Sequence, residues 1–342
     1  MILVLRALGI GDLCAAVPAL RGLRTAYPDD EIVLAAPAWL GPLVALTGAV
    51  DRLLPQHELE PPQWSVRSPR LGVNLHGCGP QSHRLLATAH PRRLLGYRCP
   101  GFPNGPQWSD PEHEVRRWCR LLSWYGIPAD PADLRLLPPP GAGVPDGVTI
   151  VHPGAKAASR RWPVERFGAV ARELAAAGHR VVVTGSAAEQ PLAGSVAAAA
   201  GLPACAVLAG QLDLSGLAAL VARARLVVCG DTGVGHLATG YGTPSVLLFG
   251  PAPPASWGPP EGRRRHRVIW HGEVTGHGEV TWHGEAAGAS APDAVHPALA
   301  AATVAEVLAE AAALDTQPLD ITPQPLDTPP TAPGGRHAAA PL

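Results

Sequence analysis

A carboxylate, a hydroxyl, two glycines and an imidazole lie within six residues, at 231–236. The apolar residues 226–228 just before them predict a short buried strand, and the residues after the turn predict a helix that carries His236. A Gly-rich turn between a strand and a helix leaves backbone N–H groups without partners, and the positive end of the helix dipole adds to their attraction for phosphate. The same residues could instead form an ordinary helix cap, with Asp231 or Thr232 as the capping side chain.

A second candidate for anion binding is the segment 152–163, His-Pro-Gly-Ala-Lys-Ala-Ala-Ser-Arg-Arg-Trp-Pro. It lies between a predicted strand at 148–152 and a predicted helix at 164–177. Taken alone, it could equally be a surface loop with solvated arginines. Because both segments follow strands of one predicted sheet, we expect them at the same edge, where backbone N–H groups and guanidinium forks would enclose a diphosphate. Its candidate ligands are Gly154, Lys156, Ser159, Arg160 and Arg161.

Two further carboxylates follow predicted strands. Glu189 comes four residues after Gly185 and could accept hydrogen bonds from ribose hydroxyls, although a glutamate that starts a helix is an equally good interpretation. Asp12 ends the short turn 9–12, Gly-Ile-Gly-Asp, which lacks the third glycine of the dinucleotide-binding fingerprint. A carboxylate there could take a proton from a hydroxyl nucleophile, or could cap the predicted helix 13–26.

The elements that must position these residues alternate between strand and helix, which is typical of a doubly wound α/β fold with parallel sheets. A Pro/Gly-rich stretch at 128–145 divides the chain into a domain at 1–140 and a domain at 141–314 that face each other across a cleft. Predicted strands lie at 2–5, 31–35, 51–54, 71–75, 148–152, 180–184, 206–208, 226–228 and 245–249. Predicted helices lie at 13–26, 37–46, 112–125, 164–177, 189–200, 214–222 and 303–314.

The composition is that of a globular chain with little charge. The 342 residues are 46% hydrophobic and 16% charged, with a formal net charge of −1, so no basic surplus points to nucleic acid. The longest apolar runs have strand length, and the N-terminus lacks a secretory signal, so we expect a cytoplasmic protein. The six cysteines are scattered without a Cys-x-x-Cys pair, which predicts buried thiols with neither disulfides nor zinc.

Two segments do not fit the alternating pattern. Residues 271–285 repeat a His-Gly-Glu unit, which could bind a metal but is better explained as a duplicated surface loop. Residues 315–342 are rich in proline and threonine and repeat Gln-Pro-Leu-Asp. Such a composition cannot bury enough apolar area to order itself, so we expect a disordered tail.

Taken in order along the chain, these motifs resemble those of glycosyltransferase family 9, which includes the ADP-heptose:lipopolysaccharide heptosyltransferases. The resemblance covers about residues 1–312, and its last motif is the most specific. The motifs are Gly-x-Gly-Asp at 9–12, Pro-Gly-Ala…Arg-Arg-Trp-Pro at 153–163, Gly-x-x-x-Glu at 185–189, and Gly-Asp-Thr-Gly-x-Gly-His…Pro…Leu-Phe-Gly-Pro at 230–251.

The resemblance implies a GT-B fold of two Rossmann-like domains and an inverting, metal-independent sugar transfer. Asp12 matches the family's general base, and Glu189 matches its ribose-binding carboxylate. Arg160 stands where the family often has lysine and would neutralise the leaving diphosphate with a fork of donors. The other implied site residues are Asp231, Thr232, Gly233 and His236 in the donor turn, Gly185 and Gly210 beside the nucleoside, and Gly9 and Gly11 in the first turn.

The implied substrates are a nucleotide-diphosphate sugar, with an ADP-sugar favoured, and a hydroxyl acceptor that is a glycan, a lipid-linked molecule or a small molecule. No cofactor is implied. The loops 78–84 and 98–108 of the first domain would set acceptor identity. A peripheral position at the inner membrane surface is compatible with a lipid-linked acceptor.

Three other functions compete with sugar transfer. A nucleotide-sugar-binding protein without activity would not need Asp12. A GT-B-like sugar-nucleotide epimerase would need additional carboxylates in the cleft, and the sequence offers no convincing set. A nicotinamide-dependent dehydrogenase would need a Gly-x-Gly-x-x-Gly turn after a strand, which is absent.

Overall fold

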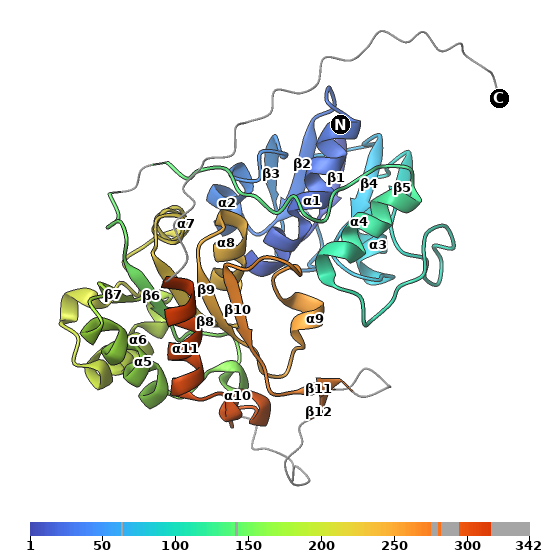
Figure 1. The fold of residues 1–342 in the computed structure, drawn as a ribbon. Coiled ribbons are helices and arrows are strands. Elements are labelled where there is room, and N and C mark those ends of the chain that lie inside the picture. Colours follow the sequence, from blue (N-terminus) through green and yellow to red (C-terminus); the bar gives the residue numbers. More distant parts are fainter. Residues whose placement is uncertain (63, 141–142, 275–279, 282–293, 316–342) are drawn as a thin grey trace, which may run out of the picture.

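Two five-stranded parallel sheets form the scaffold of this computed structural model, which describes residues 1–62, 64–140, 143–274, 280–281 and 294–315 (Figure 1). The first sheet has the strand order β3-β2-β1-β4-β5 and the second has the order β10-β9-β8-β6-β7. Neighbouring strands within both sheets run parallel. The doubly wound α/β class predicted from the sequence is therefore confirmed.

The first half of the chain follows the predicted order with small shifts at element ends. The sequence did not predict α3 or β5. The elements are β1 (Ile2–Leu5), α1 (Ile10–Ala26), β2 (Ile32–Ala36), η1 (Ala38–Leu40), α2 (Gly41–Ala45), β3 (Arg52–Pro55), β4 (Leu71–Asn74), α3 (Gln81–Ala87), β5 (Arg93–Leu95) and α4 (Glu114–Trp124).

The second half repeats the alternation. Its elements are β6 (Thr149–His152), η2 (Ala158–Arg160), α5 (Val164–Ala176), β7 (Val181–Val183), η3 (Ala187–Glu189), α6 (Gln190–Ala200), η4 (Ala204–Ala206), α7 (Leu214–Ala222), β8 (Leu226–Gly230), α8 (Gly233–Tyr241), β9 (Ser245–Leu248), α9 (Pro254–Trp257), β10 (His266–Ile269), β11 (Glu273–Val274), β12 (Val280–Thr281), α10 (Pro297–Ala301) and α11 (Val304–Asp315).

The strand predicted at 206–208 is wrong. The chain forms the short helix η4 there, and only a single bridge joins Val207 to Val183 at the edge of the second sheet. The backbone N–H of Gln211 bonds back to the carbonyl of Leu208, so the chain turns away before a strand can develop. The cysteine prediction is partly wrong as well, because Cys78 and Cys205 are exposed.

Each sheet has one point where the winding direction reverses. In the first sheet it lies between β1 and β4, and in the second between β6 and β8. Ligands of open α/β sheets bind at the carboxyl ends of the strands at such points. The segments singled out in the sequence leave these same strands: the turn 9–12 follows β1, the segment 153–163 follows β6, and the turn 231–236 follows β8.

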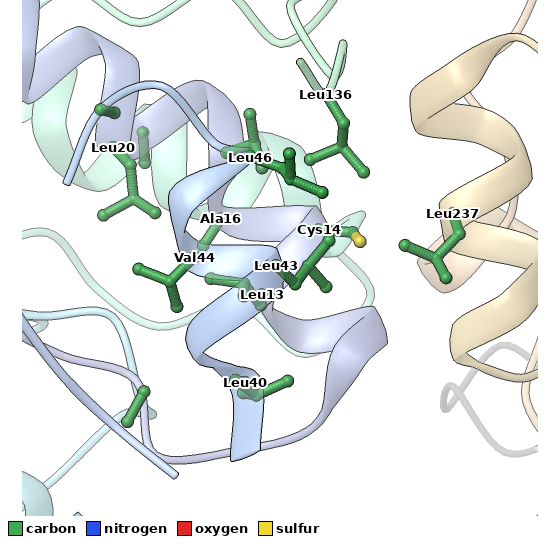
Figure 2. Close-up of a cluster of buried hydrophobic side chains, with 14 of the residues drawn as sticks. Leu13, Cys14, Ala16, Leu20, Leu40, Leu43, Val44, Leu46, Leu136 and Leu237 are labelled. Carbon is green, nitrogen blue, oxygen red and sulfur yellow. The ribbon is translucent and has the colours of Figure 1, made fainter. Parts of the chain in front are cut away.

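The two halves pack on each other through α1 and α8. Leu13 and Cys14 of α1 lie in one hydrophobic cluster with Leu237 of α8 and with Leu136 of the connecting segment (Figure 2). The backbone N–H of Leu136 also bonds to the carbonyl of Gly240, 3.1 Å away, which fixes the connection to α8. One apolar core therefore continues from the first sheet to the second.

Two glycines allow this close packing at the helix N-termini. A Cβ on Gly11 would lie 2.7 Å from the imidazole of His236, and a Cβ on Gly233 would lie 2.6 Å from the Cβ of Ile10. Each glycine thus makes room for a side chain of the other half. The turns 9–12 and 231–236, which lie more than two hundred residues apart in the sequence, are in direct contact.

Several expectations from the sequence reach beyond these residues. The tail at 315–342 lies outside the described residues apart from its first residue, and so does much of the repeat at 271–285. The described ends of that repeat include the small β11–β12 ladder. The domain boundary at 140/141 stays a prediction. In the part of the chain that the structure describes, no helix is long and apolar enough to cross a membrane.

The contact between the halves leads to a stability prediction. We expect Gly233→Ala to lower the free energy of unfolding by about 1–3 kcal/mol, because the added methyl group overpacks against Ile10. The matched control is Gly194→Ala in α6, where a Cβ has nothing within 4 Å. That change should stabilise the protein by about 0.5–1 kcal/mol. Urea unfolding measures both, and equal effects of the two changes would contradict the close packing.

Candidate functional site

A cavity of about 580 Å³ lies between the two sheets at the carboxyl ends of β1, β6 and β8. Both halves of the chain contribute to its wall. From the first half come Gly9, Ile10, Gly11, Asp12 and Trp39; from the second come His152, Gly154, Ala155, Lys156, Arg160, Glu189, Asp231, Thr232, Gly233, His236 and Trp257. The structure therefore brings together residues of all four motifs, at 9–12, 152–163, 185–189 and 230–236.

Asp12 is the third residue of α1, whereas the sequence predicted it just before the first residue of the helix. Its Oδ2 accepts a hydrogen bond from the backbone N–H of Gly9 at 3.1 Å, so Asp12 does help to close the N-terminus of the helix. Its Oδ1 lies 3.3 Å from Nη2 of Arg6, and the side chain stays 28% exposed at the cavity wall. The capping interpretation and the interpretation as a base facing the cleft are thus compatible.

Across the cavity, Arg160 and Asp231 form an ion pair, with Nη1 and Oδ2 3.3 Å apart. The Asp231 side chain is 11% exposed, and that of Arg160 is 42% exposed. Burial raises the pKa of Asp231, against the opposing influence of His236 and Arg160. Burial also lowers the pKa of His236, although Asp231 and Asp12 favour its charged form. This wall therefore offers a partly exposed cation next to a buried carboxylate whose ionisation is costly.

The turn before α8 does not use its side chains as caps. Thr232 occupies the N-cap position, but its hydroxyl makes no capping bond, and Oγ1 is buried without a hydrogen-bond partner among the described residues. Asp231 pairs with Arg160 instead. A buried hydroxyl and free backbone N–H groups at the positive end of a helix are suited to bind an anion.

Glu189 combines a capping role with exposure to the cavity. Its Oε2 accepts from the backbone N–H and the hydroxyl of Ser186, both at 2.8 Å, so the interpretation as a helix-start glutamate is correct. Burial alone would raise the pKa of Glu189, but these bonds and the nearby His152 and Arg161 lower it. Its Oε1 approaches Gly154 so closely that a Cβ there would collide with it. One carboxylate oxygen is thus held by Ser186, and the Glu189 side chain contributes to the cavity wall.

Four predicted site residues do not line the cavity. The carbonyl of Ser159 accepts from His296, and Nε of Arg161 donates to the carbonyl of Ala155 at 3.0 Å. Gly185 and Gly210 are joined by a backbone hydrogen bond of 3.0 Å, and Gly210 has a φ of +73°, which favours glycine. These residues shape the surrounding loops. Within the described residues, no three His, Cys, Asp or Glu side chains are arranged to hold a metal.

Three residues that line the cavity and could take part in binding or catalysis were not among the predicted site residues. His152 belongs to the segment 152–163, but nothing in the sequence indicates that its side chain faces the cavity. Burial lowers its pKa, and its Nδ1 lies 3.0 Å from the hydroxyl of Thr184. Trp39 of η1 and Trp257 of α9 carry no sequence signal, because a single tryptophan is more simply explained by packing in a core. Trp257 stands edge-on to His236 with ring centroids 6.0 Å apart, and Trp39 is 54% exposed.

Residues 128–274 match the family model described as glycosyltransferase family 9 (heptosyltransferase). Lipopolysaccharide heptosyltransferase 2 of Salmonella typhimurium is 25% identical over 294 residues, which are 74% of this chain and 83% of that protein. Lipopolysaccharide heptosyltransferase 1 of Pseudomonas aeruginosa is 35% identical over 155 residues, 43% of this chain and 42% of the relative.

Solved structures of similar proteins share the arrangement of both sheets. A family 9 glycosyl transferase from Veillonella parvula superposes with a TM-score of 0.73 at 20% identity, over 92% of this chain and 96% of that one. The ADP-heptose LPS heptosyltransferase II of Escherichia coli superposes with a TM-score of 0.67 at 23% identity, over 92% and 98% of the two chains. The expected GT-B fold is confirmed.

The buried carboxylate in the cavity gives a pH-dependent prediction. A carboxyl group whose pKa is raised by folding destabilises the folded state when it is ionised, and this cost disappears as the pH falls below its unfolded pKa. Asp231→Asn should therefore raise the melting temperature of the ligand-free protein at pH 8, with a gain that shrinks towards pH 4. Asp146→Asn, at a carboxylate that is 76% exposed, is the control and should change little. A lower melting temperature of Asp231→Asn at pH 8 would show that the pairing with Arg160 outweighs burial.

Proposed function

Since the chain is a glycosyltransferase of family 9, we propose that it transfers a heptose or a related sugar from an ADP-linked donor to a hydroxyl group, with inversion and without a metal ion. The observation that carries this proposal is the shared cavity, in which Asp12 of one half and Arg160 of the other line the same space. A transferase of this family is neither an inactive binding protein nor an epimerase.

The donor diphosphate is assigned to the wall formed by the second half of the chain. Lys156 and Arg160 supply positive charge there, and the N-terminus of α8 adds backbone donors and the unpartnered hydroxyl of Thr232. As the bond between sugar and diphosphate breaks, negative charge accumulates on the leaving ADP, and these preorganised donors stabilise it. Arg160 keeps a fork geometry that can bridge Asp231 and a phosphate oxygen.

The nucleoside is assigned to Glu189. Its Oε2 is already held by Ser186, so the carboxylate cannot rotate freely, and the residue lines the cavity. An oriented carboxylate oxygen is well suited to accept from a ribose hydroxyl. Gly154 is required beside it because a side chain there would occupy the space of Oε1.

Asp12 is assigned the role of general base. Its carboxylate takes the proton from the acceptor hydroxyl while that oxygen forms a bond to the anomeric carbon. The bond from the anomeric carbon to the diphosphate breaks with its electron pair on the leaving ADP. Because attack comes from the side of Asp12 and departure is towards Arg160, the anomeric configuration inverts.

The acceptor is proposed to be a lipopolysaccharide core, by analogy with the lipopolysaccharide heptosyltransferases reported above. In this proposal residues 1–140 hold the acceptor and residues 141–314 hold the donor. A lipid-linked acceptor would bring the protein to the inner membrane surface. The cytoplasmic location expected from the sequence stays a prediction.

Donor binding can be tested by thermal shift with ADP, UDP, GDP and dTDP and with sugars linked to each. A ligand at a hundredfold its dissociation constant should stabilise the protein by about 2.7 kcal/mol, and we expect ADP-heptose to give the largest shift. Arg160→Met should remove most of that shift, because the diphosphate loses its guanidinium partner. Absence of a shift with every nucleotide would contradict the donor site.

Base catalysis can be tested with Asp12→Asn, which keeps the shape of the side chain. We expect sugar transfer from ADP-heptose to a heptose-deficient lipopolysaccharide core to fall by about 10²–10⁴-fold, while the dissociation constant of ADP stays within about twofold. The control is Asp133→Asn, at an aspartate that pairs with Arg21 outside the cavity. If Asp12→Asn weakened ADP binding as strongly as transfer, the proposed role as base would be wrong.

A further inference from the structure

A buried guanidinium lies directly behind the proposed base. The Arg6 side chain has no exposed surface, and its Nε donates to the backbone carbonyl of Asp12 at 2.8 Å. Its Nη2 lies 3.3 Å from Oδ1 of Asp12, and its Nη1 donates to the carbonyl of Leu75 at the end of β4. One side chain therefore contacts the main chain and the carboxylate of Asp12 and ties both to the central strands.

Arg6 is itself held by a second carboxylate. Its Nη2 donates to Oε1 of Glu114 at 3.0 Å, and the guanidinium lies 4.8 Å from the ring centroid of Trp118. Glu114 is fully engaged, since Oε1 also accepts from Nε1 of Trp118 at 2.9 Å and Oε2 accepts from Nε of Arg117 at 2.9 Å. Its side chain is only 12% exposed. The first turn of α4 thus fixes the position of Arg6 through the same nitrogen, Nη2, that faces Asp12.

We propose that Arg6 and Glu114 are positioning residues that set the orientation of the Asp12 carboxylate for proton transfer. This inference rests on the proposed role of Asp12 as base. With Oδ2 held by the N–H of Gly9 and Oδ1 by Arg6, the carboxylate has a fixed plane and still has lone pairs free for a substrate hydroxyl. Burying charged side chains is costly, and a purely structural contact could be made by apolar residues of similar size.

The same cluster joins the base to the opposite half of the chain. His113, the residue before Glu114, places Nε2 2.9 Å from the carbonyl oxygen of Gly258. Gly258 follows α9, whose last residue, Trp257, lines the cavity. The helix that holds Arg6 is therefore anchored to the donor side, so the orientation of Asp12 depends on the two halves being packed together.

The test compares Arg6→Lys and Glu114→Gln with Glu112→Gln. Glu112 also holds an arginine, since Oε2 lies 2.7 Å from Nη2 of Arg120, but it makes no contact with Arg6, so its substitution is a matched control. With ADP-heptose and a heptose-deficient lipopolysaccharide core as substrates, we expect Arg6→Lys to lower kcat by about 100-fold, the scale of a misplacement of about 1 Å. Glu114→Gln should lower kcat in the same direction. The KM for ADP-heptose and the dissociation constant of ADP should stay within about twofold for all three.

A double-mutant comparison separates this inference from the proposed function. If Arg6 acts through Asp12, the Asp12→Asn/Arg6→Lys double variant should transfer sugar no more slowly than Asp12→Asn alone. A folded Arg6→Lys or Glu114→Gln protein with the kcat of the control would overturn the positioning role and leave the proposed base untouched. Full activity of Asp12→Asn would overturn the base assignment, and the positioning role with it.

Discussion

The close contact between the N-termini of α1 and α8 is the constraint on which the rest of this structure depends. Gly11 makes room for His236, and Gly233 makes room for Ile10. Without this contact, Asp12 and the turn 231–236 would lie on separate sheets facing open solvent. With it, the segments that follow the strands at the winding reversals of both sheets line one cavity. The glycines of the two turns therefore serve the packing between the halves.

Buried charge is the second feature shared by both sides of the cavity. Asp231 is ionised only at a cost because it is buried, and Arg160 offsets part of that cost. On the other side, Arg6 lies between the carboxylates of Asp12 and Glu114 without any exposed surface. Such groups contribute little to stability, and they are retained here beside the atoms proposed to bind the donor and to move a proton.

The sequence predicted the alternating elements well because the central strands are continuous apolar runs and the helices are amphipathic. Ile2–Leu5 and Ser245–Leu248 are buried throughout. The prediction failed where tertiary contacts decide the structure. A strand was expected at 206–208, but the segment near Val207 turns away after one bridge. β5 and β10 were not predicted, because they are short edge strands with charged residues. Asp12 and Glu189 were each given two competing roles, and in both cases the carboxylate helps to close a helix while remaining at the cavity.

The sequence by itself determined which residues could bind a phosphate or take a proton, because glycine turns after apolar strands have only a few possible conformations. It could not determine that these turns meet, since the contact between Gly11 and His236 joins residues more than two hundred positions apart. The sequence also did not predict the positions of Trp39 and Trp257 at the cavity, or the ion pair between Arg6 and Glu114. Their positions depend on side chains of different helices and strands packing together. The spacing of residues within one segment carries no information about such contacts.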